Sequence, residues 1–397
     1  MLFTNLHLPS THIEVIARIE AMRLRLKLML QQAPRRWTGS LRRSTFALAI
    51  QGSNAIEGFH VTSDDVAAAI DGEEPLDEKN DAWYAVRGYR EAMTYVLQLA
   101  DDPHFAHHEA VLRSLHFMMT SHDLRANPGR WRPGLIYVQR AGTGEVVYEG
   151  PDAGEVPALM SELVASLNEP SAMPTLVRAA LAHLNLVMIH PFSDGNGRMA
   201  RALQTLVLAR EGILDPTFSS IEEYLGHDTL QYYAVLAEVG RGQWRPRNDP
   251  LPWIRYCLTA HFRQAETLLR RTQETSRLWE ALERELTHRG MQERMTAALL
   301  DAALGYRVRN TSYRKATGVS EGVASRDLAA LVAADMLVAQ GEKRGRHYVA
   351  SEWLQEQRAR VDLPRVQTDP FSGAQVREEP ARYRARRAME PVEAPTG

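Results

Sequence analysis

The sequence is short of the features that mark secreted and membrane proteins. It contains a single cysteine, Cys257, so it cannot form a disulfide within the chain. The first ten residues, MLFTNLHLPS, have neither the basic start nor the apolar core of a signal peptide. No apolar run reaches the roughly 20 residues that cross a membrane. These absences predict a cytoplasmic protein with a reduced thiol.

The chain also lacks a strong charge of one sign, because its formal net charge is −2 at pH 7. No overall field therefore directs it to nucleic acid or to a membrane, and any such contact has to be local. Its 397 residues are 44% hydrophobic and 24% charged, which is usual for a globular protein. That length predicts two or three domains.

What the chain does contain is an unusual stretch at residues 190–201, HPFSDGNGRMAR. Apolar residues with helical spacing precede it in ALAHLNLVMI and follow it in MARALQTLVLAR, so we expect a glycine-rich turn between two helices. Gly195 and Gly197 let the backbone bend and approach a ligand closely. The N–H groups that open the second helix, together with its dipole, favour an anion in the turn.

The charged residues of this turn suit a phosphate ligand. Arg198 and Arg201 are three residues apart, so they share one face of the second helix and both can reach the same oxyanions. Asp194 repels a polyphosphate unless a cation lies between them, which predicts a Mg²⁺ ligand. His190 has an ordinary pKa near neutrality and can take a proton from an attacking hydroxyl. The plainer interpretation is a capped helix–turn–helix with surface charges.

The stretch resembles the Fic motif, H-P-F-x-[D/E]-G-N-G-R-x-x-R, at every defined position. Fic proteins are mostly AMP transferases, or AMPylators, which move AMP from ATP to a Ser, Thr or Tyr hydroxyl of a protein and release pyrophosphate. The resemblance implies that His190 is the general base, that Asp194 binds Mg²⁺ and that Arg201 holds the γ-phosphate. It assigns ATP binding to the rest of the motif, with Phe192 as the core anchor of the loop and Gly195, Asn196, Gly197 and Arg198 as the phosphate cradle.

The predicted fold is mainly α, a Fic-type helical core with a β-hairpin flap. Residues 136–149 are the one stretch with strand character before residue 250. In Fic proteins this hairpin holds the target protein by main-chain pairing; the plainer interpretation is an incidental hairpin. Tyr232 and Tyr233 in LQYYAVL resemble a tyrosine pair that lies against the adenine and ribose of ATP, although tyrosines at helical spacing are also ordinary core residues.

A second pattern lies in QGSNAIEGFH at residues 51–60, where Ser53, Glu57 and Gly58 fit [S/T]-x-x-x-E-[G/N]. Ser53 and Glu57 are one helical turn apart on the same face, and Gly58 is a helix stop. The pattern resembles the inhibitory motif of Fic proteins, in which the glutamate enters the ATP site and pairs with the second motif arginine, here Arg201. The serine would then orient the helix end. The plainer interpretation is a surface glutamate near a helix C-terminus.

The C-terminal third predicts a separate module. From about residue 290 the chain reads as three helices and a hairpin, which is typical of a winged helix and resembles the one in many long Fic proteins. Winged helices bind DNA, dock proteins or form dimers, so DNA and a second copy of the chain are both candidate partners. The basic residues that would contact DNA phosphates are Arg314, Lys315, Arg326, Lys343, Arg344, Arg346 and His347.

These observations give one domain scheme and one leading function. We expect an N-terminal helical region at 1–104 with the inhibitory helix at about 40–58, a Fic domain at 105–245, connecting helices at 246–288, a winged helix at 289–351 and a disordered tail at 352–397. The leading function is an autoinhibited protein AMPylator that uses ATP and Mg²⁺ and modifies target proteins and itself.

Two alternatives stay open. The same site serves Fic chemistry of another polarity, either removal of AMP or transfer of another nucleotide or phosphoryl group. In the second alternative, the chain is a winged-helix DNA-binding regulator whose Fic domain only senses nucleotide.

Overall fold

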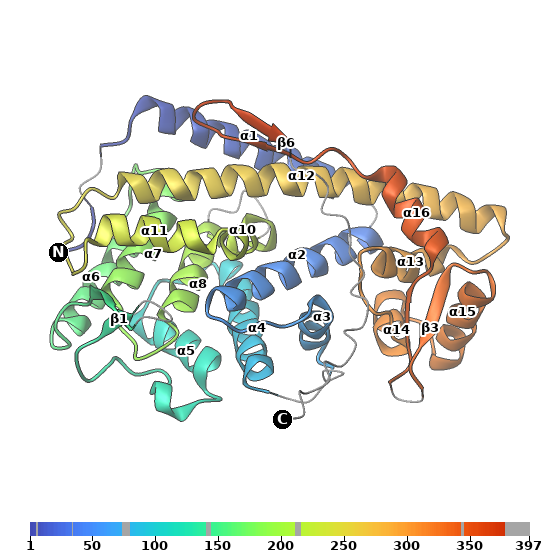
Figure 1. The fold of residues 1–397 in the computed structure, drawn as a ribbon, viewed down its shortest axis with the longest axis horizontal. Helices are drawn as coiled ribbons and strands as arrows, with labels where there is room; N and C mark the ends of the chain where they lie inside the picture. The colour runs from blue at the N-terminus through green and yellow to red at the C-terminus, as the bar shows by residue number, and fades with distance from the viewer. Residues whose placement is uncertain are drawn as a thin grey trace, which may run out of the picture.

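The computed structural model describes residues 1–4, 7–33, 35–73, 80–139, 144–210, 216–342 and 345–377. Within these ranges the chain is mainly helical, as the sequence predicts, and its strands form short antiparallel hairpins (Figure 1). None of the helices in the described ranges has both the length and the apolar character needed to cross a membrane.

The helices up to the motif turn are α1 (Ser10–Gln32), α2 (Arg35–Ile56), α3 (Ser63–Asp71), α4 (Asp81–Ala100), α5 (Glu109–Thr120), η1 (Leu124–Ala126), α6 (Val156–Asn168) and α7 (Thr175–Ile189). Those after it are α8 (Asn196–Ala209), α9 (Pro216–Ser219), α10 (Glu222–His227), α11 (Thr229–Gly240), α12 (Leu251–His288), η2 (Glu293–Met295), α13 (Thr296–Ala303), α14 (Asn310–Thr317), α15 (Glu321–Ala333) and α16 (Glu352–Val361). The hairpins pair β1 (Tyr137–Gln139) with β2 (Val146–Glu149), β3 (Leu337–Gln340) with β4 (His347–Ala350), and β5 (Val366–Thr368) with β6 (Gln375–Arg377).

Local capping explains where several helices begin and end. The Thr62 hydroxyl accepts a hydrogen bond from the Asp65 N–H at 3.1 Å and starts α3. Gly72 ends the same helix with a φ of +71°, a conformation that costs glycine little. The Asn80 side chain accepts from the Trp83 N–H at 2.9 Å and starts α4. The short α3 is therefore bounded at both ends by its own sequence.

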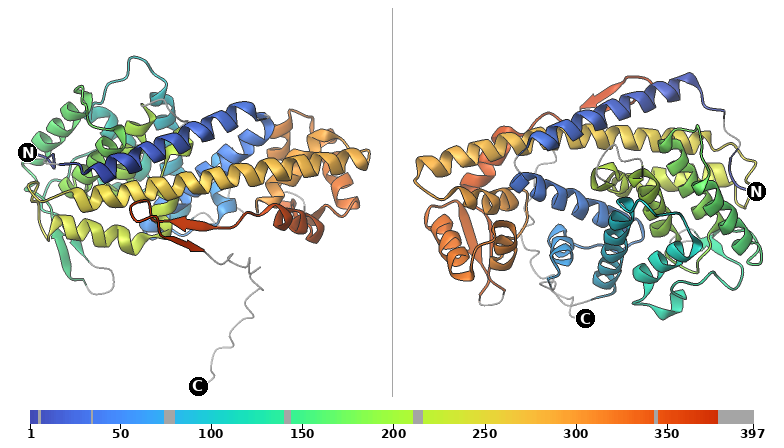
Figure 2. Two further views of the ribbon diagram at one scale, coloured as in Figure 1. Left: turned by 90° about the horizontal axis from the view of Figure 1, so that it is seen from above. Right: turned by 180° about the vertical axis from the view of Figure 1, so that it is seen from behind.

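A single helix, α12, stands where the sequence predicts connecting helices. It has 38 residues and runs along most of the molecule, and α1 lies beside it (Figures 1 and 2). Its buried side chains form one continuous stripe from Trp253 to Leu286. The first half of this stripe packs on the helices around the motif turn, and the second half packs on α13 and α16.

Two hydrophobic cores divide the described chain. The first surrounds the motif turn and includes Ile50 of α2, Phe192 of the turn and Trp253 of α12. The second lies under the second half of α12 and also takes in Leu26 of α1 and Leu41 of α2. Because the N-terminal helices contribute to both cores, the region before residue 105 has no separate core. The proposed boundary at 104/105 divides sequence regions, not packing units.

The segment from α13 to β4, residues 296–350, is called the C-terminal module below. Its order is three helices followed by the β3–β4 hairpin, as the sequence predicts. Its designation as a winged helix stays a prediction. Lys343 and Arg344 of the expected wing lie outside the described residues.

The prediction of a disordered tail at 352–397 is wrong for its first part. Residues 352–361 form α16, and β5–β6 follows. Leu354 is fully buried, and Arg358 pairs with the buried Glu274 of α12 at 3.1 Å. Thr368 donates to Glu266 of α12 at 2.9 Å. A composition poor in apolar residues misled the prediction, because polar contacts with α12 order this segment. Residues 378–397 lie outside the described residues.

Candidate functional site

The motif turn contains two left-handed backbone positions. Helix α7 ends at His190, whose φ is +52°, and α8 follows Gly195, whose φ is +75°. Glycine adopts this conformation readily, whereas histidine does so at a cost. Helices α7 and α8 pack against each other on either side of the turn. The turn that the sequence predicts is confirmed, and His190 stands at its start.

The His190 ring is held in one tautomer. Its Nδ1 lies 3.1 Å from the carbonyl oxygen of Val187. Because a carbonyl oxygen only accepts, Nδ1 carries the hydrogen and Nε2 keeps a lone pair. Burial lowers the pKa of His190 from its ordinary value. The ring is therefore neutral at pH 7, which is the form that a general base needs.

Arg132 holds the strained start of the turn. Its Nε donates to the carbonyl of His190 at 2.8 Å, and its two terminal nitrogens donate to the carbonyls of Gly134 and Pro151. Its backbone N–H donates to the Pro191 carbonyl at 2.9 Å. The side chain is buried. Sequence reasoning missed this residue, because nothing in the spacing between residues 132 and 190 connects the two segments.

The middle of the turn is anchored by Asn196 and Phe192. The Asn196 side chain accepts from the Phe192 N–H and donates to the Phe192 carbonyl, both at 2.9 Å. The Phe192 ring is fully buried, as the predicted core anchor requires. Asn196 thus shapes the turn with its side chain, and only its backbone N–H, at the start of α8, is left for a ligand.

His116 of α5 is a second residue that sequence reasoning missed. Its ring stacks on Phe192 with centroids 3.7 Å apart and planes 6° from parallel. Its Nδ1 accepts from the Gly129 N–H at 2.9 Å, so its Nε2 carries the hydrogen and donates to the Asp194 carbonyl at 3.0 Å. Burial lowers the pKa of His116 to about 4. A neutral, fully bonded ring therefore fixes the backbone at Asp194.

Both motif arginines are buried and keep open donors. Arg198 and Arg201 are each 1% exposed. Within the described ranges, Nε and Nη1 of Arg198 and Nη1 of Arg201 have no hydrogen-bond partner. Native proteins rarely leave buried donors open, since each costs about 1–3 kcal/mol. An oxyanion of a ligand would satisfy these nitrogens, so the predicted phosphate cradle fits the geometry.

Asp194 faces outward next to this cradle. Its side chain is 62% exposed, and its carboxylate lies 3.3 Å from Nη2 of Arg198. Across the described chain, no three histidines, cysteines or acids lie close enough together to hold a metal by themselves. Mg²⁺ is commonly bound by one carboxylate together with substrate phosphates, and a single exposed carboxylate beside open guanidinium donors fits that pattern.

The second predicted motif meets the first at Arg201. Nε of Arg201 donates to the Ser53 hydroxyl at 2.7 Å, and Nη2 donates to the Ser53 carbonyl at 2.9 Å and to Glu57 at 2.7 Å. The Glu57 side chain is 22% exposed. Ser53 therefore binds the arginine directly, which is more than the orienting role that we expected of it. Gly58 follows with a φ of +82° and ends the segment.

The Glu57 carboxylate also lies against the first turn of α8. A Cβ built on Gly197 would collide with Oε1 of Glu57 and lie 3.1 Å from Nη1 of Arg201. The carboxylate thus occupies the N-terminus of the helix, where the dipole and the N–H groups favour an anion. Because glycine at 197 has no Cβ, an anion can approach the backbone this closely.

A second carboxylate lies behind Ser53. Glu222 of α10 is buried and accepts from the Tyr89 hydroxyl at 2.8 Å. Burial raises the pKa of Glu222 to about 7, and Arg201 acts in the opposite direction. Sequence reasoning missed Glu222, because its bond with Tyr89 joins segments 133 positions apart.

The two tyrosines of the predicted ATP site lie in different surroundings. Tyr232 is 1% exposed, and its hydroxyl is 3.0 Å from Nε2 of the buried His183. Tyr233 is 46% exposed and donates to the Ile56 carbonyl, next to Glu57, at 3.3 Å. The geometry therefore favours Tyr233 as the member of the pair with a surface for a ligand, and Tyr232 as core.

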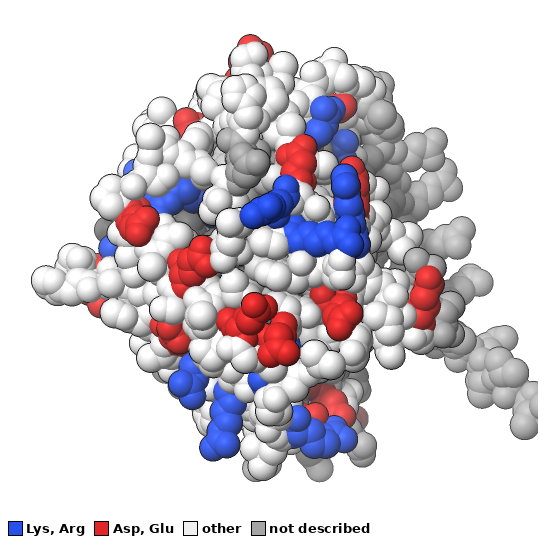
Figure 3. Space-filling model, turned by 90° about the vertical axis from the view of Figure 1, so that its left-hand side faces the viewer, with Lys and Arg blue, Asp and Glu red and all other residues white. Residues whose placement is uncertain are grey.

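The β1–β2 hairpin lies where the sequence predicts a flap. Its strands pair antiparallel, with Tyr137 opposite Glu149, and the loop residues 140–143 lie outside the described residues. The buried Tyr148 hydroxyl donates to the Met188 carbonyl at 2.7 Å and ties β2 to the end of α7. Figure 3 views the end of the molecule that carries this hairpin; acidic side chains gather between two groups of basic ones, so this face has no single sign of charge.

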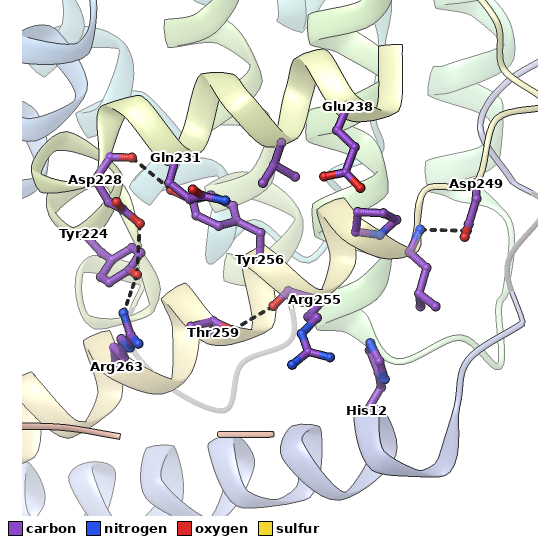
Figure 4. A pocket seen from close by; sticks show the side chains of 13 residues that line it. His12, Tyr224, Asp228, Gln231, Glu238, Asp249, Arg255, Tyr256, Thr259 and Arg263 are labelled. Atoms are coloured by element: carbon purple, nitrogen blue, oxygen red, sulfur yellow. Dashed lines mark hydrogen bonds between the residues drawn. The ribbon is translucent and has the colours of Figure 1, made fainter. Parts of the chain in front are cut away.

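A cavity of about 540 Å³ lies apart from the motif turn, and no motif residue lines it. Figure 4 shows Arg255 of α12 and His12 of α1 on one side and Glu238 of α11 on the other. Tyr256 lines this cavity and contacts Trp253, which in turn contacts Tyr232. A layer of aromatic rings therefore separates the cavity from Arg201.

Comparisons with known proteins point to one family. The Fic/DOC family model matches residues 106–208. The chain is 40% identical over 89 residues to protein adenylyltransferase fic-1 of Caenorhabditis briggsae, which covers 22% of this chain and 16% of that protein. It is 33% identical over 181 residues to protein adenylyltransferase Fic of Aedes aegypti, which covers 45% of this chain and 32% of that protein. The chain thus spans less than half the length of the curated relatives that it matches.

Solved structures agree on the fold. A Fic family protein from Desulfovibrio desulfuricans G20 has a TM-score of 0.56 and 24% identity, covering 87% of this chain and 98% of that one. Fic-1 from C. elegans has a TM-score of 0.52 and 21% identity, covering 66% of this chain and 72% of that one. At these identities the likeness concerns the fold alone.

Proposed function

Since residues 106–208 of this chain are a Fic domain, we propose that the protein is an adenylyltransferase that moves AMP from ATP to a hydroxyl of a protein. The observation that carries this proposal is the set of buried guanidinium nitrogens on Arg198 and Arg201 that lack a partner among the described residues. Both arginines lie in α8, at the other end of the turn that starts with His190, whose Nε2 is ready to accept a proton. An anion site beside a neutral base suits phosphoryl-group chemistry.

The residues of this chain divide the reaction between them. Arg198, Arg201 and the first N–H groups of α8 hold the phosphates. Nε2 of His190 takes the proton of the target hydroxyl. The hydroxyl oxygen bonds to the α-phosphorus of ATP, and pyrophosphate leaves. Such a base contributes about 10²- to 10⁴-fold. Mg²⁺, held by Asp194 and by phosphate oxygens, would neutralise charge on the polyphosphate.

The same geometry supports autoinhibition by Glu57. Its carboxylate takes one donor of Arg201 and lies at the start of α8, so it occupies the two features that attract a terminal phosphate. A terminal phosphate and Glu57 therefore compete for Arg201 and for the start of α8. While Glu57 is in place, ATP binds weakly or with its α-phosphate misaligned for attack.

The target hydroxyl belongs to a Ser, Thr or Tyr side chain that the β1–β2 hairpin presents to His190. Main-chain pairing with a strand of this hairpin would tolerate many target sequences. The exposed Tyr137 and Val146 on the two strands add an apolar surface for the target. Transfer of phosphate would use the same donors, so the labelled position of ATP has to distinguish it from transfer of AMP. Removal of AMP consumes no ATP and would appear as release of AMP from labelled protein.

The deciding experiment follows the label from ATP into protein. Purified Glu57→Gly protein is incubated with Mg²⁺ and ATP labelled at the α-phosphate or at the γ-phosphate. Transfer of AMP labels protein from α-labelled ATP only, and kinase-type transfer labels it from γ-labelled ATP only. Addition of His190→Ala in the same chain is the control for chemistry in this site. Absence of label from either nucleotide, in a folded protein that binds ATP, would leave the nucleotide-sensing regulator as the better explanation.

A further inference from the structure

The C-terminal module is bound to α3 by charged contacts. Arg307 pairs with Asp64 at 3.0 Å, and its backbone N–H donates to the same carboxylate at 2.8 Å. Arg309 pairs with Glu73, just after α3, at 2.6 Å. The Thr311 hydroxyl also donates to Glu73. Acidic groups at both ends of α3 are thus held by one segment of the module, residues 307–311.

The module also holds α2, the helix that ends at the inhibitory glutamate. Arg43 of α2 lies 3.3 Å from Asp71 of α3 and 3.3 Å from Asp301 of α13. The Tyr306 ring lies over the Arg43 guanidinium at 5.4 Å, and its hydroxyl donates to Ser44 at 3.1 Å. A single arginine therefore ties α2, α3 and the module together.

A displacement at these contacts would reach Glu57 through helix α2 and through the short link between α2 and α3. Arg43 and Ser53 lie on the same helix, so a shift of one end of α2 moves the other. Only residues 57–62 separate the end of α2 from α3, and Gln51 of α2 donates to the Val61 carbonyl in that link at 2.9 Å. At Gly52 the backbone of α2 touches the backbone of α10. This close contact prevents α2 from absorbing a shift by a small local adjustment.

We propose that the C-terminal module is a latch that keeps the inhibitory helix seated on Arg201, and that an acidic polypeptide which takes the place of α3 on the module opens it. This inference rests on the proposed inhibition by Glu57. The kind of partner follows from the groups that the surface binds here. Besides carboxylates, the module binds a peptide carbonyl, since Lys315 donates to the Asp71 carbonyl. The carboxylates and the main-chain carbonyl that the module binds here are all groups of a polypeptide.

The first test opens the latch by reversing charge. Asp64→Arg with Glu73→Arg sets like charges against Arg307 and Arg309, and Arg307→Glu with Arg309→Glu does the same from the module. Hydrogen exchange of residues 53–61 should rise about five-fold or more in either variant, at the low end of measured coupling between sites. Labelling from α-labelled ATP should rise by a similar factor. All four changes together restore opposite charges and should recover at least half of each effect.

A control variant and two possible outcomes test the proposed latch. Glu91→Arg breaks an exposed pair with Arg87 on α4 and should leave residues 53–61 unchanged. Unchanged exchange at 53–61 in folded charge-reversed variants would overturn the latch. If the charge-reversed variants show raised exchange but no labelling, and Glu57→Gly is also unlabelled, the proposed transferase is overturned. The mechanical coupling between the module and residues 53–61 then still stands.

The second test concerns the partner. In the Asp64→Arg, Glu73→Arg variant Arg307 and Arg309 lose their carboxylate partners on and after α3, so a peptide of residues 61–73 can compete for them in trans. Its fluorescence anisotropy should rise with added protein. The matched peptide with Asn at 64 and 71 and Gln at 73 should bind at least about ten-fold more weakly. No binding of the first peptide up to millimolar protein, or tighter binding of a DNA duplex, would overturn the assignment of an acidic polypeptide.

Discussion

Replacement of Glu57 by glycine should have two opposite effects, one on ATP affinity and one on stability. In the free protein the Glu57 carboxylate accepts from Arg201 at 2.7 Å, and a hydrogen bond between charged groups is worth about 1.5–3 kcal/mol. If ATP has to displace this bond, its loss should tighten ATP binding about ten- to hundred-fold, because 1.4 kcal/mol corresponds to a factor of ten. The free energy of unfolding without ATP should fall by about 1–3 kcal/mol, since a buried cation loses its partner.

Calorimetric titration with ATP and Mg²⁺ measures the first effect. It is done in the His190→Ala background so that no turnover disturbs the binding curve. Urea unfolding of the same proteins measures the second. Glu57→Gln serves as the matched variant, because it keeps the size of the side chain and removes its charge; we expect an intermediate gain in affinity. Glycine at 57 adds little helix strain, because α2 ends at Ile56.

The reasoning would be refuted by a change in ATP affinity of less than about two-fold together with the expected loss of stability. The pair between Glu57 and Arg201 would then be a structural contact, and ATP would bind without displacing it. If both variants instead bind ATP more tightly than the parent and with equal affinity, the charge of Glu57 keeps ATP out and its bulk does not.

Four further predictions concern other residues of the site. His190→Ala should reduce labelling at least about 10²-fold while ATP still binds by calorimetry, because the base is lost and the anion site remains; near-normal labelling would remove His190 from the mechanism. Because burial lowers the pKa of His190, the acid limb of the pH–rate profile should fall below pH 6.5, and a midpoint above that value would contradict the buried base. Asp194→Ala should require far more Mg²⁺ for half-maximal labelling, and an unchanged Mg²⁺ titration would place the metal elsewhere. Burial raises the pKa of Glu222 to about 7 in the folded protein, so stability is lost as pH rises through that value. The free energy of unfolding should therefore fall about 1 kcal/mol more between pH 6 and pH 8 in the wild type than in Glu222→Gln, and equal slopes would refute a protonated Glu222.

The sequence predicts the parts of the site that are local or that belong to a long motif. The turn at 190–195 follows from residue types at short spacing. The pairing of Glu57 with Arg201 joins distant segments, and the resemblance of the two motifs to those of Fic proteins implied it. His116, Arg132 and Glu222 do not follow, because each acts through contacts between segments far apart in the chain. Their spacing in the sequence carries no trace of these contacts.

One error has a clear physical origin. Composition predicted disorder for residues 352–377, yet Leu354 and the polar contacts of Arg358 and Thr368 with α12 order this segment. Tertiary contacts decide the outcome, and a pattern of residue types does not report them. The ATP-binding role of Tyr232 stays a prediction, because its side chain is as buried as those of Arg198 and Arg201.

The length of α12 restricts how this protein can change in evolution. A helix of 38 residues is about 57 Å long, and each added residue turns everything beyond it by about 100°. One insertion near its middle would rotate Leu278, Leu282 and Leu286 out of the second core while Trp253 kept its place in the first. Such insertions should be rare among homologues within residues 251–288, whereas length variation should gather in the loops at either end of the helix.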